Sequence, residues 1–355
     1  MPKSFFQDAL KKWYHHHKRD LPWRKTSDPY RIWLSEIMLQ QTRVAQGLPY
    51  YHRFVDKFRD VKALAQADDD EVMKLWEGLG YYSRARNMLA TARFVHGELN
   101  GAFPTDYEDI KKLKGVGEYT AAAIASFAFD KAHAVVDGNV QRVLARFLGI
   151  ETAVNTTAGK KELAEAAQYM LDLEQPATYN QAIMEFGALQ CVPRNPGCAN
   201  CVLNTQCVAY ANGQVDSLPH KNRKKYNRER YLHYFLIKQG QEVLVEKRSG
   251  PGIWQGLFQF PLVEAAESLT PQQLLNELFA NLKVSVQKET ALPPHKLSHQ
   301  TLHIRILEVN ISGRHAVKAE EGQQWVRVSE LAQLAFPRPL RQYLDQIQLT
   351  LPFGT

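Results

Sequence analysis

The chain has 355 residues, more than one hydrophobic core usually organises, so two or three domains are expected. Hydrophobic residues make up 45% of the sequence and charged residues 23%, as in an ordinary globular protein. No apolar run approaches the roughly 18 residues of a membrane helix, and the first 20 residues lack the apolar core of an export signal. We therefore expect a cytoplasmic protein, and its net charge of +7 indicates a polyanionic partner.

The first 210 residues have the apolar spacing of helices, and residues 28–46, DPYRIWLSEIMLQQTRVAQ, are an example. Glu36 lies in this segment, on the face that carries Ile32, Trp33 and Leu39. An ionised carboxylate is costly to bury, so its pKa should rise and favour a proton donor. The alternative is a glutamate at the margin of the apolar face whose carboxylate reaches water.

A glycine-rich turn follows within residues 105–128, where LKGVGEYTAAAI (113–124) separates two helical patterns. The segment matches the helix-hairpin-helix pattern over the whole turn. Gly115 and Gly117 leave backbone N–H groups open at the start of the second helix, where a phosphate oxygen can accept from them. The turn therefore predicts binding to a phosphate backbone, with a plain helix–helix turn as the alternative.

A second candidate carboxylate is Asp137, in AVVDGNVQRVLARFLG and directly before a new helical pattern. Aspartate is also a preferred N-cap residue, because its side chain accepts from N–H groups of the first turn. By itself, this position does not separate a functional carboxylate from a capping one.

All four cysteines of the chain fall within residues 191–207, with the spacing C-x6-C-x2-C-x5-C. They are Cys191, Cys198, Cys201 and Cys207. Structural disulfides rarely persist in the cytosol, so a bound metal is favoured. Structural zinc ligands usually come as two close pairs, whereas four thiolates in one loop can enclose a [4Fe–4S] cluster. The spacing favours the cluster over zinc or a chance grouping.

The pattern changes after residue 212. Residues 213–230 read as a basic linker, since residues 221–230 hold six Lys or Arg. Strand-type runs such as YLHYFLIK, EVLVEKR and LHIRILEVNI follow, interrupted by the helical TPQQLLNELFANL. The sequence therefore predicts a mainly α part at 1–212, the linker at 213–230 and an α/β domain at 231–355.

The order of these features resembles that of the helix-hairpin-helix, iron–sulfur DNA glycosylases over nearly the whole chain. Four segments closely resemble the adenine DNA glycosylases of the MutY family: LPWR (21–24), SEIMLQQTRV (35–44), GLGYYSRARN (78–87) and VDGNVQRVLAR (136–146). The resemblance implies base excision repair, with removal of adenine mispaired with 8-oxoguanine or G in double-stranded DNA. It also implies a nucleoid-associated cytoplasmic enzyme, and we expect a monomer.

The resemblance assigns roles to the catalytic candidates. It implies that Glu36 protonates the adenine ring and that Asp137 faces the sugar cation, as an anion or as a transient covalent partner. Tyr119 and Asn139 match positions that support these carboxylates; a packing tyrosine and a helix-start asparagine are the alternatives. A pair of carboxylates that divides these tasks suits glycosidic hydrolysis, and the target base must leave the stack to meet them.

Other matching positions concern the DNA around the lesion. The resemblance implies that Gln41, Thr42, Leu79 and Tyr81 wedge into the duplex near the opposite 8-oxoguanine, although Leu79 and Tyr81 could also pack in a core. Trp23 and Arg24 match the entry to the base pocket.

The α/β domain resembles the Nudix fold at GIWQGLFQFP. It lacks the run of glutamates that holds Mg²⁺ in Nudix hydrolases, so we expect it to recognise the lesion rather than hydrolyse a nucleotide. Its LSH segment (297–299), with Ser298 and His299, matches the loop that probes 8-oxoguanine, with Leu297 where the family usually has phenylalanine.

Two other functions compete with this one. An endonuclease-III-like glycosylase and lyase for oxidised pyrimidines would need a lysine nucleophile after the glycine turn, where the chain has Tyr119. A non-catalytic iron–sulfur DNA-binding protein would not need both carboxylates. The sequence therefore favours a monofunctional glycosylase.

Overall fold

The computed structural model describes residues 3–222, 228–278, 283–312 and 317–348. Its tertiary contacts divide the chain into two units. The first, the helical unit, holds residues 1–66 and 87–223, and the second, the sheet unit, holds residues 67–86 and 224–355. The predicted fold class, a mainly α part followed by an α/β part, is confirmed.

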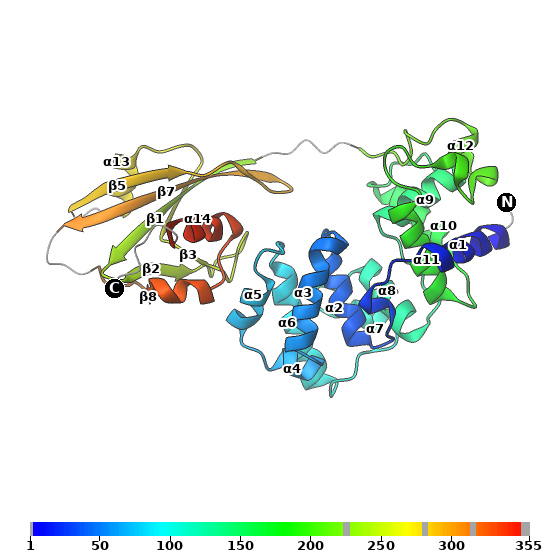
Figure 1. Ribbon diagram of the computed structural model, residues 1–355, viewed down its shortest axis with the longest axis horizontal. Helices are drawn as coiled ribbons and strands as arrows, with labels where there is room; N and C mark the ends of the chain where they lie inside the picture. Colours follow the sequence, from blue (N-terminus) through cyan, green and yellow to red (C-terminus); the bar gives the residue numbers. More distant parts are fainter. Residues whose placement is uncertain (1–2, 223–227, 279–282, 313–316, 349–355) are drawn as a thin grey trace. The chain divides into compact units, whose positions relative to one another are not determined.

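The helical unit is built from helices joined by short turns (Figure 1). Those before the glycine turn are α1 (Lys3–His17), η1 (Pro22–Arg24), α2 (Pro29–Leu39), α3 (Val44–Lys57), α4 (Val61–Ala65), most of α6 (Ser83–Glu98) and α7 (Tyr107–Lys111). Those after it are α8 (Glu118–Phe129), α9 (Gly138–Leu148), α10 (Thr157–Met170), α11 (Pro176–Leu189), η2 (Cys198–Asn200), η3 (Asn204–Gln206) and α12 (Val208–Ala211).

Local sequence explains where many of these helices begin. The side chains of Asp28, Asp60 and Asp106 accept from first-turn N–H groups of α2, α4 and α7, and Pro29 stands at the first position of α2. The apolar faces of α1, α9, α10 and α11 then form one core, which includes Phe6 and Phe147. This core holds α9 and α11, which carry much of the candidate site.

The glycine turn between α7 and α8 has the predicted form. Gly115 has a φ of +81°, and a Cβ added to it would lie 2.8 Å from the Cβ of Asn87. Only glycine fits this position without strain. Gly117 caps α8 without a side-chain hydrogen bond, so the first turn of α8 offers its N–H groups at an exposed surface.

The sheet unit holds α5 (Asp69–Trp76), the first residues of α6 and one mixed sheet. Its strands are β1 (Arg228–Gln239), β2 (Glu242–Lys247), β3 (Phe258–Gln259), β4 (Leu262–Ala265), β5 (Lys283–Ala291), β6 (His295–Lys296), β7 (Gln300–Ser312) and β8 (Gln323–Arg327). The main strand order is β3-β2-β1-β7-β5, and β4, β6 and β8 pair with β1, β7 and β2. The central pair, β1 and β7, is parallel, whereas its neighbours are antiparallel.

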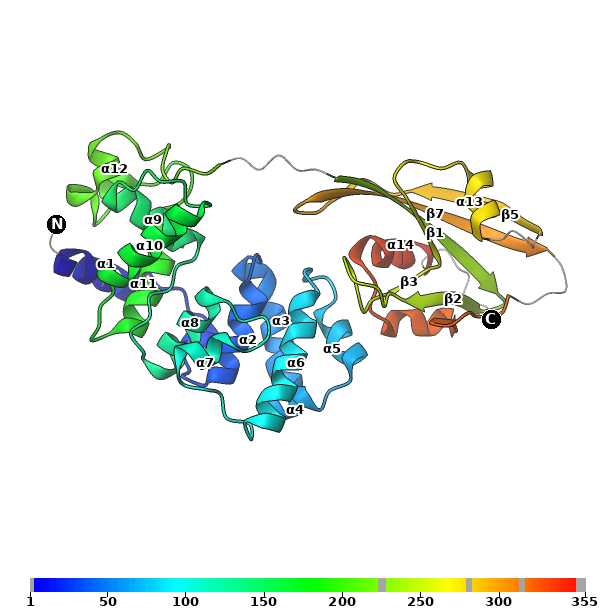
Figure 2. The same cartoon turned by 180° about the vertical axis from the view of Figure 1, so that it is seen from behind.

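Two helices cover this sheet, α13 (Pro271–Leu278) and α14 (Arg338–Gln348), with η4 (Val328–Gln333) before α14. Figures 1 and 2 show α13 and α14 on opposite faces of the sheet. Leu274 of α13 packs with Leu307 of β7. Tyr343 of α14 donates to Glu308, the next residue of β7, over 2.9 Å. Adjacent strand residues point to opposite faces, so β7 is covered on both sides.

The predicted domain boundaries stay predictions, because part of the proposed linker, residues 223–227, lies outside the described residues. Residues 67–86, which we expected in the helical part, group with the C-terminal sheet unit. Throughout the ranges that the structure describes, every helix is too short or too polar to cross a membrane.

Candidate active site

One pocket of the helical unit brings together the predicted catalytic residues. Its lining includes Glu36 from α2, Tyr119 from α8 and both Asp137 and Asn139 from the start of α9. Three other predicted residues, Trp23, Arg24 and Thr42, line the same pocket. Residues spread over about 120 positions of the sequence therefore meet at one cavity, as an active site requires.

Of the two predicted carboxyl groups, Glu36 is the more deeply buried, with 5% of the residue exposed. Burial raises the pKa of Glu36 to about 7, against a lowering contribution from the Tyr119 hydrogen bond. In that bond the Tyr119 hydroxyl donates to Oε2 over 2.7 Å. The predicted rise is confirmed, and the alternative of a carboxylate that reaches water is not what the structure shows. A carboxyl group with this pKa can hold a proton near neutral pH and donate it.

Asp137 is both the N-cap of α9 and a pocket residue. Its Oδ1 accepts from the backbone N–H groups of Asn139 (2.9 Å) and Val140 (2.7 Å), and its Oδ2 accepts from the Asn139 side chain (2.8 Å). Burial raises the pKa of Asp137, although these hydrogen bonds act in the opposite direction. The two interpretations from sequence are therefore compatible, because capping holds this carboxylate at the pocket.

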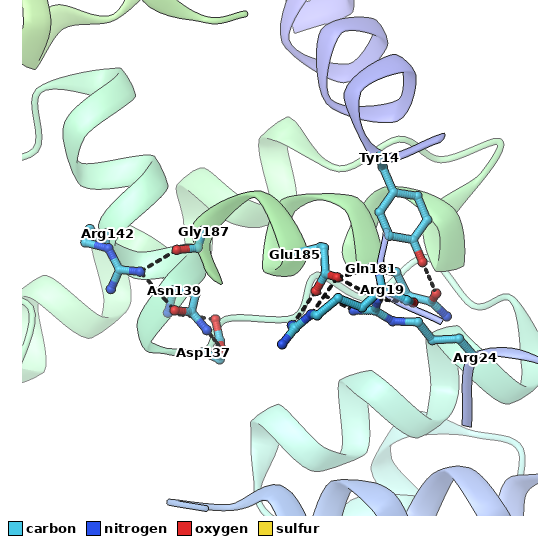
Figure 3. A network of polar contacts seen from close by, with 9 residues as sticks. All are labelled: Tyr14, Arg19, Arg24, Asp137, Asn139, Arg142, Gln181, Glu185 and Gly187. Carbon is cyan, nitrogen blue, oxygen red and sulfur yellow. Dashed lines mark hydrogen bonds and ion pairs between the residues drawn. The ribbon is translucent and has the colours of Figure 1, made fainter. Parts of the chain in front are cut away.

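Arg142, which we did not single out from the sequence, holds Asn139 in place. Its guanidinium donates to Asn139 Oδ1 (2.9 Å) and to the carbonyl of Gly187 (2.6 Å) (Figure 3). It also donates to the carbonyl of Cys191 (2.7 Å). Arg142 thus links the start of α9 to the end of α11 and to the first cysteine of the loop. The sequence shows that Arg142 lies one helical turn after Asn139, but it does not show which other groups Arg142 binds.

A third carboxylate of the pocket, Glu185 of α11, was also missed. Its side chain is 0% exposed and pairs with two arginines. Arg24 donates to both carboxylate oxygens over 2.9 and 2.7 Å, and Arg19 also binds both (Figure 3). Burial alone would raise the pKa of Glu185, but the hydrogen bonds from Arg19 and Arg24 lower it to about 2.

Glu185 and Glu36 therefore differ in charge although both line one pocket. Near neutral pH, Glu185 is a carboxylate, whereas Glu36 is partly protonated. Carboxyl groups whose environments drive their pKa values apart are typical of acid–base sites. Glu185 could have been noticed as a glutamate within the apolar helical run AIMEFGAL, by the argument used for Glu36.

The four cysteines border a second cavity of the helical unit, together with Arg146 and Leu203. All four thiols are free and half-buried. Arg146 is 3% exposed and lies 3.4 Å from Cys191 Sγ, and it also donates to the carbonyls of Val192 and Pro193. Burial raises the pKa of Cys198, Cys207 and Cys201, the last to about 11. Among the described residues, no three His, Cys, Asp or Glu side chains are grouped to hold a metal ion.

The remaining candidates fall into two groups. Gln41 is exposed and has a φ of +56° where α2 ends, next to the pocket residue Thr42. In the sheet unit, Leu79 is buried, which favours its packing alternative, whereas Tyr81 is 47% exposed with a φ of +48°. Positive φ at a bulky residue is strained, and such strain is often found at functional positions.

The predicted lesion loop lies between β6 and β7, where Ser298 and His299 are exposed. The Ser298 hydroxyl is 2.9 Å from the hydroxyl of Tyr81. The structure therefore brings together two residues, 217 positions apart, that we had singled out separately for contacts near the 8-oxoguanine.

Comparison with known proteins agrees with this architecture. Residues 34–169 match the model of the HhH-GPD superfamily of base excision DNA repair proteins, and residues 233–346 match the model of a NUDIX domain. A thermostable thymine-DNA glycosylase superposes with a TM-score of 0.55 at 31% identity, covering 59% of this chain and 97% of that one. The trapped endonuclease III–DNA covalent intermediate, with a TM-score of 0.52 at 21% identity, shares the fold over 60% of this chain and 99% of its own. The helical part is thus that of a base excision DNA repair protein.

Full-length relatives narrow the assignment. The adenine DNA glycosylase of Buchnera aphidicola (subsp. Baizongia pistaciae) is 34% identical over 98% of this chain and 98% of its own. That of Mus musculus is 34% identical over 97% of this chain and 79% of its own. The chain belongs to the adenine DNA glycosylase family, whose members are hydrolases of the N-glycosidic bond.

Proposed function

We propose that this chain is a monofunctional DNA glycosylase that removes adenine mispaired with 8-oxoguanine or G, in base excision repair. The observation that carries the proposal is the pair of carboxyl groups in one pocket, with the pKa of Glu36 raised to about 7 by burial and Asp137 held by the start of α9.

The two carboxyl groups divide the chemistry. Glu36 gives its proton to the adenine ring, so that the base leaves as a neutral molecule when the bond between the base and C1′ breaks. The sugar then carries a positive charge, which the Asp137 carboxylate stabilises. Water adds its oxygen to C1′, and its released proton returns to the Glu36 carboxylate. Tyr119 and Asn139 orient the two carboxyl groups through the hydrogen bonds described above.

Excision without strand cleavage follows from the residue beside Glu36. A lyase step needs an amine that attacks the sugar, and Tyr119 supplies a phenol whose hydroxyl already donates to Glu36. This contact disfavours the endonuclease-III-like alternative. The intact pair of carboxyl groups in turn disfavours a protein that only binds DNA.

Duplex DNA is the proposed partner, and several exposed features support it. The net charge is +7, and the glycine turn at Gly115 and Gly117 presents open N–H groups at the start of α8. Gln41, Thr42 and Tyr81 are proposed to contact the duplex near the lesion, whereas the burial of Leu79 favours packing within the sheet unit. Ser298 and His299 are proposed to read the 8-oxoguanine, supported by the Tyr81–Ser298 contact. Monomeric action in the cytoplasm stays an expectation.

The proposed substrate and reaction are tested by one assay. The protein is incubated with duplexes that carry A opposite 8-oxoguanine, A opposite G, or thymine glycol, and base release is scored separately from strand breakage. We expect adenine release from the first two duplexes without strand breakage. Release of thymine glycol with strand breakage would instead support the endonuclease-III-like function.

We further propose that Cys191, Cys198, Cys201 and Cys207 hold a [4Fe–4S] cluster. The four thiols border one cavity, and Arg146 places a positive charge beside Cys191 Sγ, which suits thiolate ligands. When bound, the cluster would tie the loop of residues 191–207 together. Protein purified without oxygen should contain iron and inorganic sulfide, and Cys198→Ser should reduce both. One zinc per chain without sulfide would contradict the proposal.

A further inference from the structure

The segment before the predicted lesion-contacting loop is attached, through the carboxylate of Glu77, to α14 and to the residues just before α14. Glu77 ends α5, and its Oε1 accepts from the backbone N–H of Phe336 (2.9 Å) and from Nε of Arg341 (2.9 Å). Lys74 pairs with the other oxygen. The side chains of Glu77 and Arg341 are only 13% and 15% exposed. We call Lys74, Glu77, Phe336 and Arg341 the Glu77 cluster.

Arg341 extends this cluster into the C-terminal part of the sheet unit. Its Nη2 donates to the carbonyls of Leu331 and Leu334, and its guanidinium lies 5.2 Å from the centre of the Phe336 ring. Phe336 is fully buried and packs on Phe260. Glu77 is therefore attached to a packed part of the sheet unit rather than to a surface side chain.

The loop that follows Glu77 is itself held in one conformation. Gly78, Gly80 and Tyr81 have φ values of +92°, +78° and +48°. The indole N–H of Trp76 donates to the Gly80 carbonyl (3.0 Å), and the N–H of Gly78 donates to the Tyr82 hydroxyl (3.2 Å). A loop with internal bonds moves with the end of α5. Whatever fixes the end of α5 therefore also fixes the place of Tyr81.

Other contacts between residues 67–86 and the C-terminal part are weaker candidates. Lys247 pairs with Asp70, but their side chains are 41% and 44% exposed, and exposed ion pairs contribute little. Arg86 donates to the carbonyl of Gln255 beyond the loop. The Glu77 and Arg341 side chains are less exposed than those of Lys247 and Asp70, so water weakens their ion pair less. The Glu77 cluster is thus a more buried polar attachment of α5 than the Lys247–Asp70 pair.

We propose that Glu77 is a positioning residue for lesion recognition: through Arg341 and Phe336 it holds the loop of residues 78–82 so that Tyr81 meets Ser298. This inference rests on the proposed function, in which Tyr81 and Ser298 lie at the lesion. Weakening the cluster should reduce the preference for A opposite 8-oxoguanine and leave the chemistry at A opposite G unchanged, because Glu77 lies outside the catalytic pocket.

The test uses Glu77→Gln, Arg341→Gln and the double variant in the full chain. Glutamine keeps an acceptor for the Phe336 N–H, so folding should be retained. The matched control is Glu289→Gln with Arg305→Gln, an ion pair on β5 and β7 whose arginine is 16% exposed and which makes none of the contacts of the Glu77 cluster. Single-turnover base release is measured on both mispairs, and hydrogen exchange is measured at the amides of residues 67–86.

We expect the ratio of the two rates to fall about three- to tenfold in each single variant, with no further loss in the double variant and no change in the control. Exchange in residues 67–86 should accelerate in the same variants. Faster exchange with an unchanged ratio would overturn the positioning role, and unchanged exchange would overturn the attachment itself. If the wild type releases no adenine, the proposed function fails, and exchange alone decides whether Glu77 holds the segment.

Discussion

The catalytic pocket and the Tyr81–Ser298 contact are built in opposite ways. In the pocket, Glu36 is buried and each carboxyl group has at least one short hydrogen bond. Tyr81 and Ser298 are exposed, share one hydrogen bond and lie on loops, one of them strained. Burial shifts pKa values, which proton transfer needs, whereas exposed hydroxyls can exchange their mutual bond for one to DNA. The two regions should therefore respond differently to substitution.

The largest effects are expected in the pocket. Glu36→Gln keeps the shape of the side chain but removes the proton, so base release should fall by at least about 10² while mispair binding survives. Base release should fall similarly in Asp137→Asn, because an amide cannot balance the charge of the sugar cation. Asparagine is as good an N-cap as aspartate, so α9 should still form. Single-turnover kinetics and DNA binding measure the two properties. Variants that release the base at close to the wild-type rate would show that these residues have only a structural role.

The pH dependence should report the same two groups. Glu36 must be protonated, and burial raises its pKa to about 7, so base release should fall about tenfold per pH unit above that value. Asp137 must be ionised, and burial raises its pKa. On the acid side, base release should therefore begin to fall at a pH above the ordinary aspartate pKa of about 3.9. Rates measured from pH 4 to about pH 9 test both sides. A flat profile above neutrality would exclude Glu36 as the acid.

Removing residues 225–355 separates the two regions directly. All residues that line the catalytic pocket belong to the helical unit, so we expect the truncated protein to keep its iron and to release adenine opposite G within about tenfold of the full chain. The preference for A opposite 8-oxoguanine should disappear, because Ser298 and the partners of Glu77 are removed together. Equal loss on both duplexes would mean that this part contributes only general affinity for DNA.

The smallest effect is expected at the exposed contact. Ser298→Ala removes one hydroxyl and should lower the preference for 8-oxoguanine by less than about tenfold, the usual effect of one hydrogen bond. Tyr81→Phe removes the other hydroxyl of the same pair and should give a similar change. The control is Ser217→Ala, an exposed serine in the helical unit whose hydroxyl donates to the nearby carbonyl of Gln214. A loss above about 10² would show that Ser298 takes part in the chemistry.

Much of this protein was determined by local sequence. Apolar spacing placed Glu36 on a buried face, a preferred capping residue placed Asp137 at the start of a helix, and glycine was required at Gly115 by its positive φ. The four cysteines lie within 17 residues, so their grouping could be read from the sequence. The fold class followed from the change between helical and strand periodicity near residue 230. Such features depend on neighbours a few positions away, and periodicity and capping encode those neighbours.

Only the tertiary structure decided which charges pair across the fold. Glu185 meets Arg19 and Arg24 from 166 and 161 positions away, and Glu77 meets Arg341 from 264 positions away. It also placed residues 67–86, which lie within the stretch that matches the repair superfamily, in the same unit as the C-terminal sheet. Helical spacing shows that a charged residue faces inward but not which element packs against it. That partner is set by the packing of whole helices and sheets, which a local pattern does not contain.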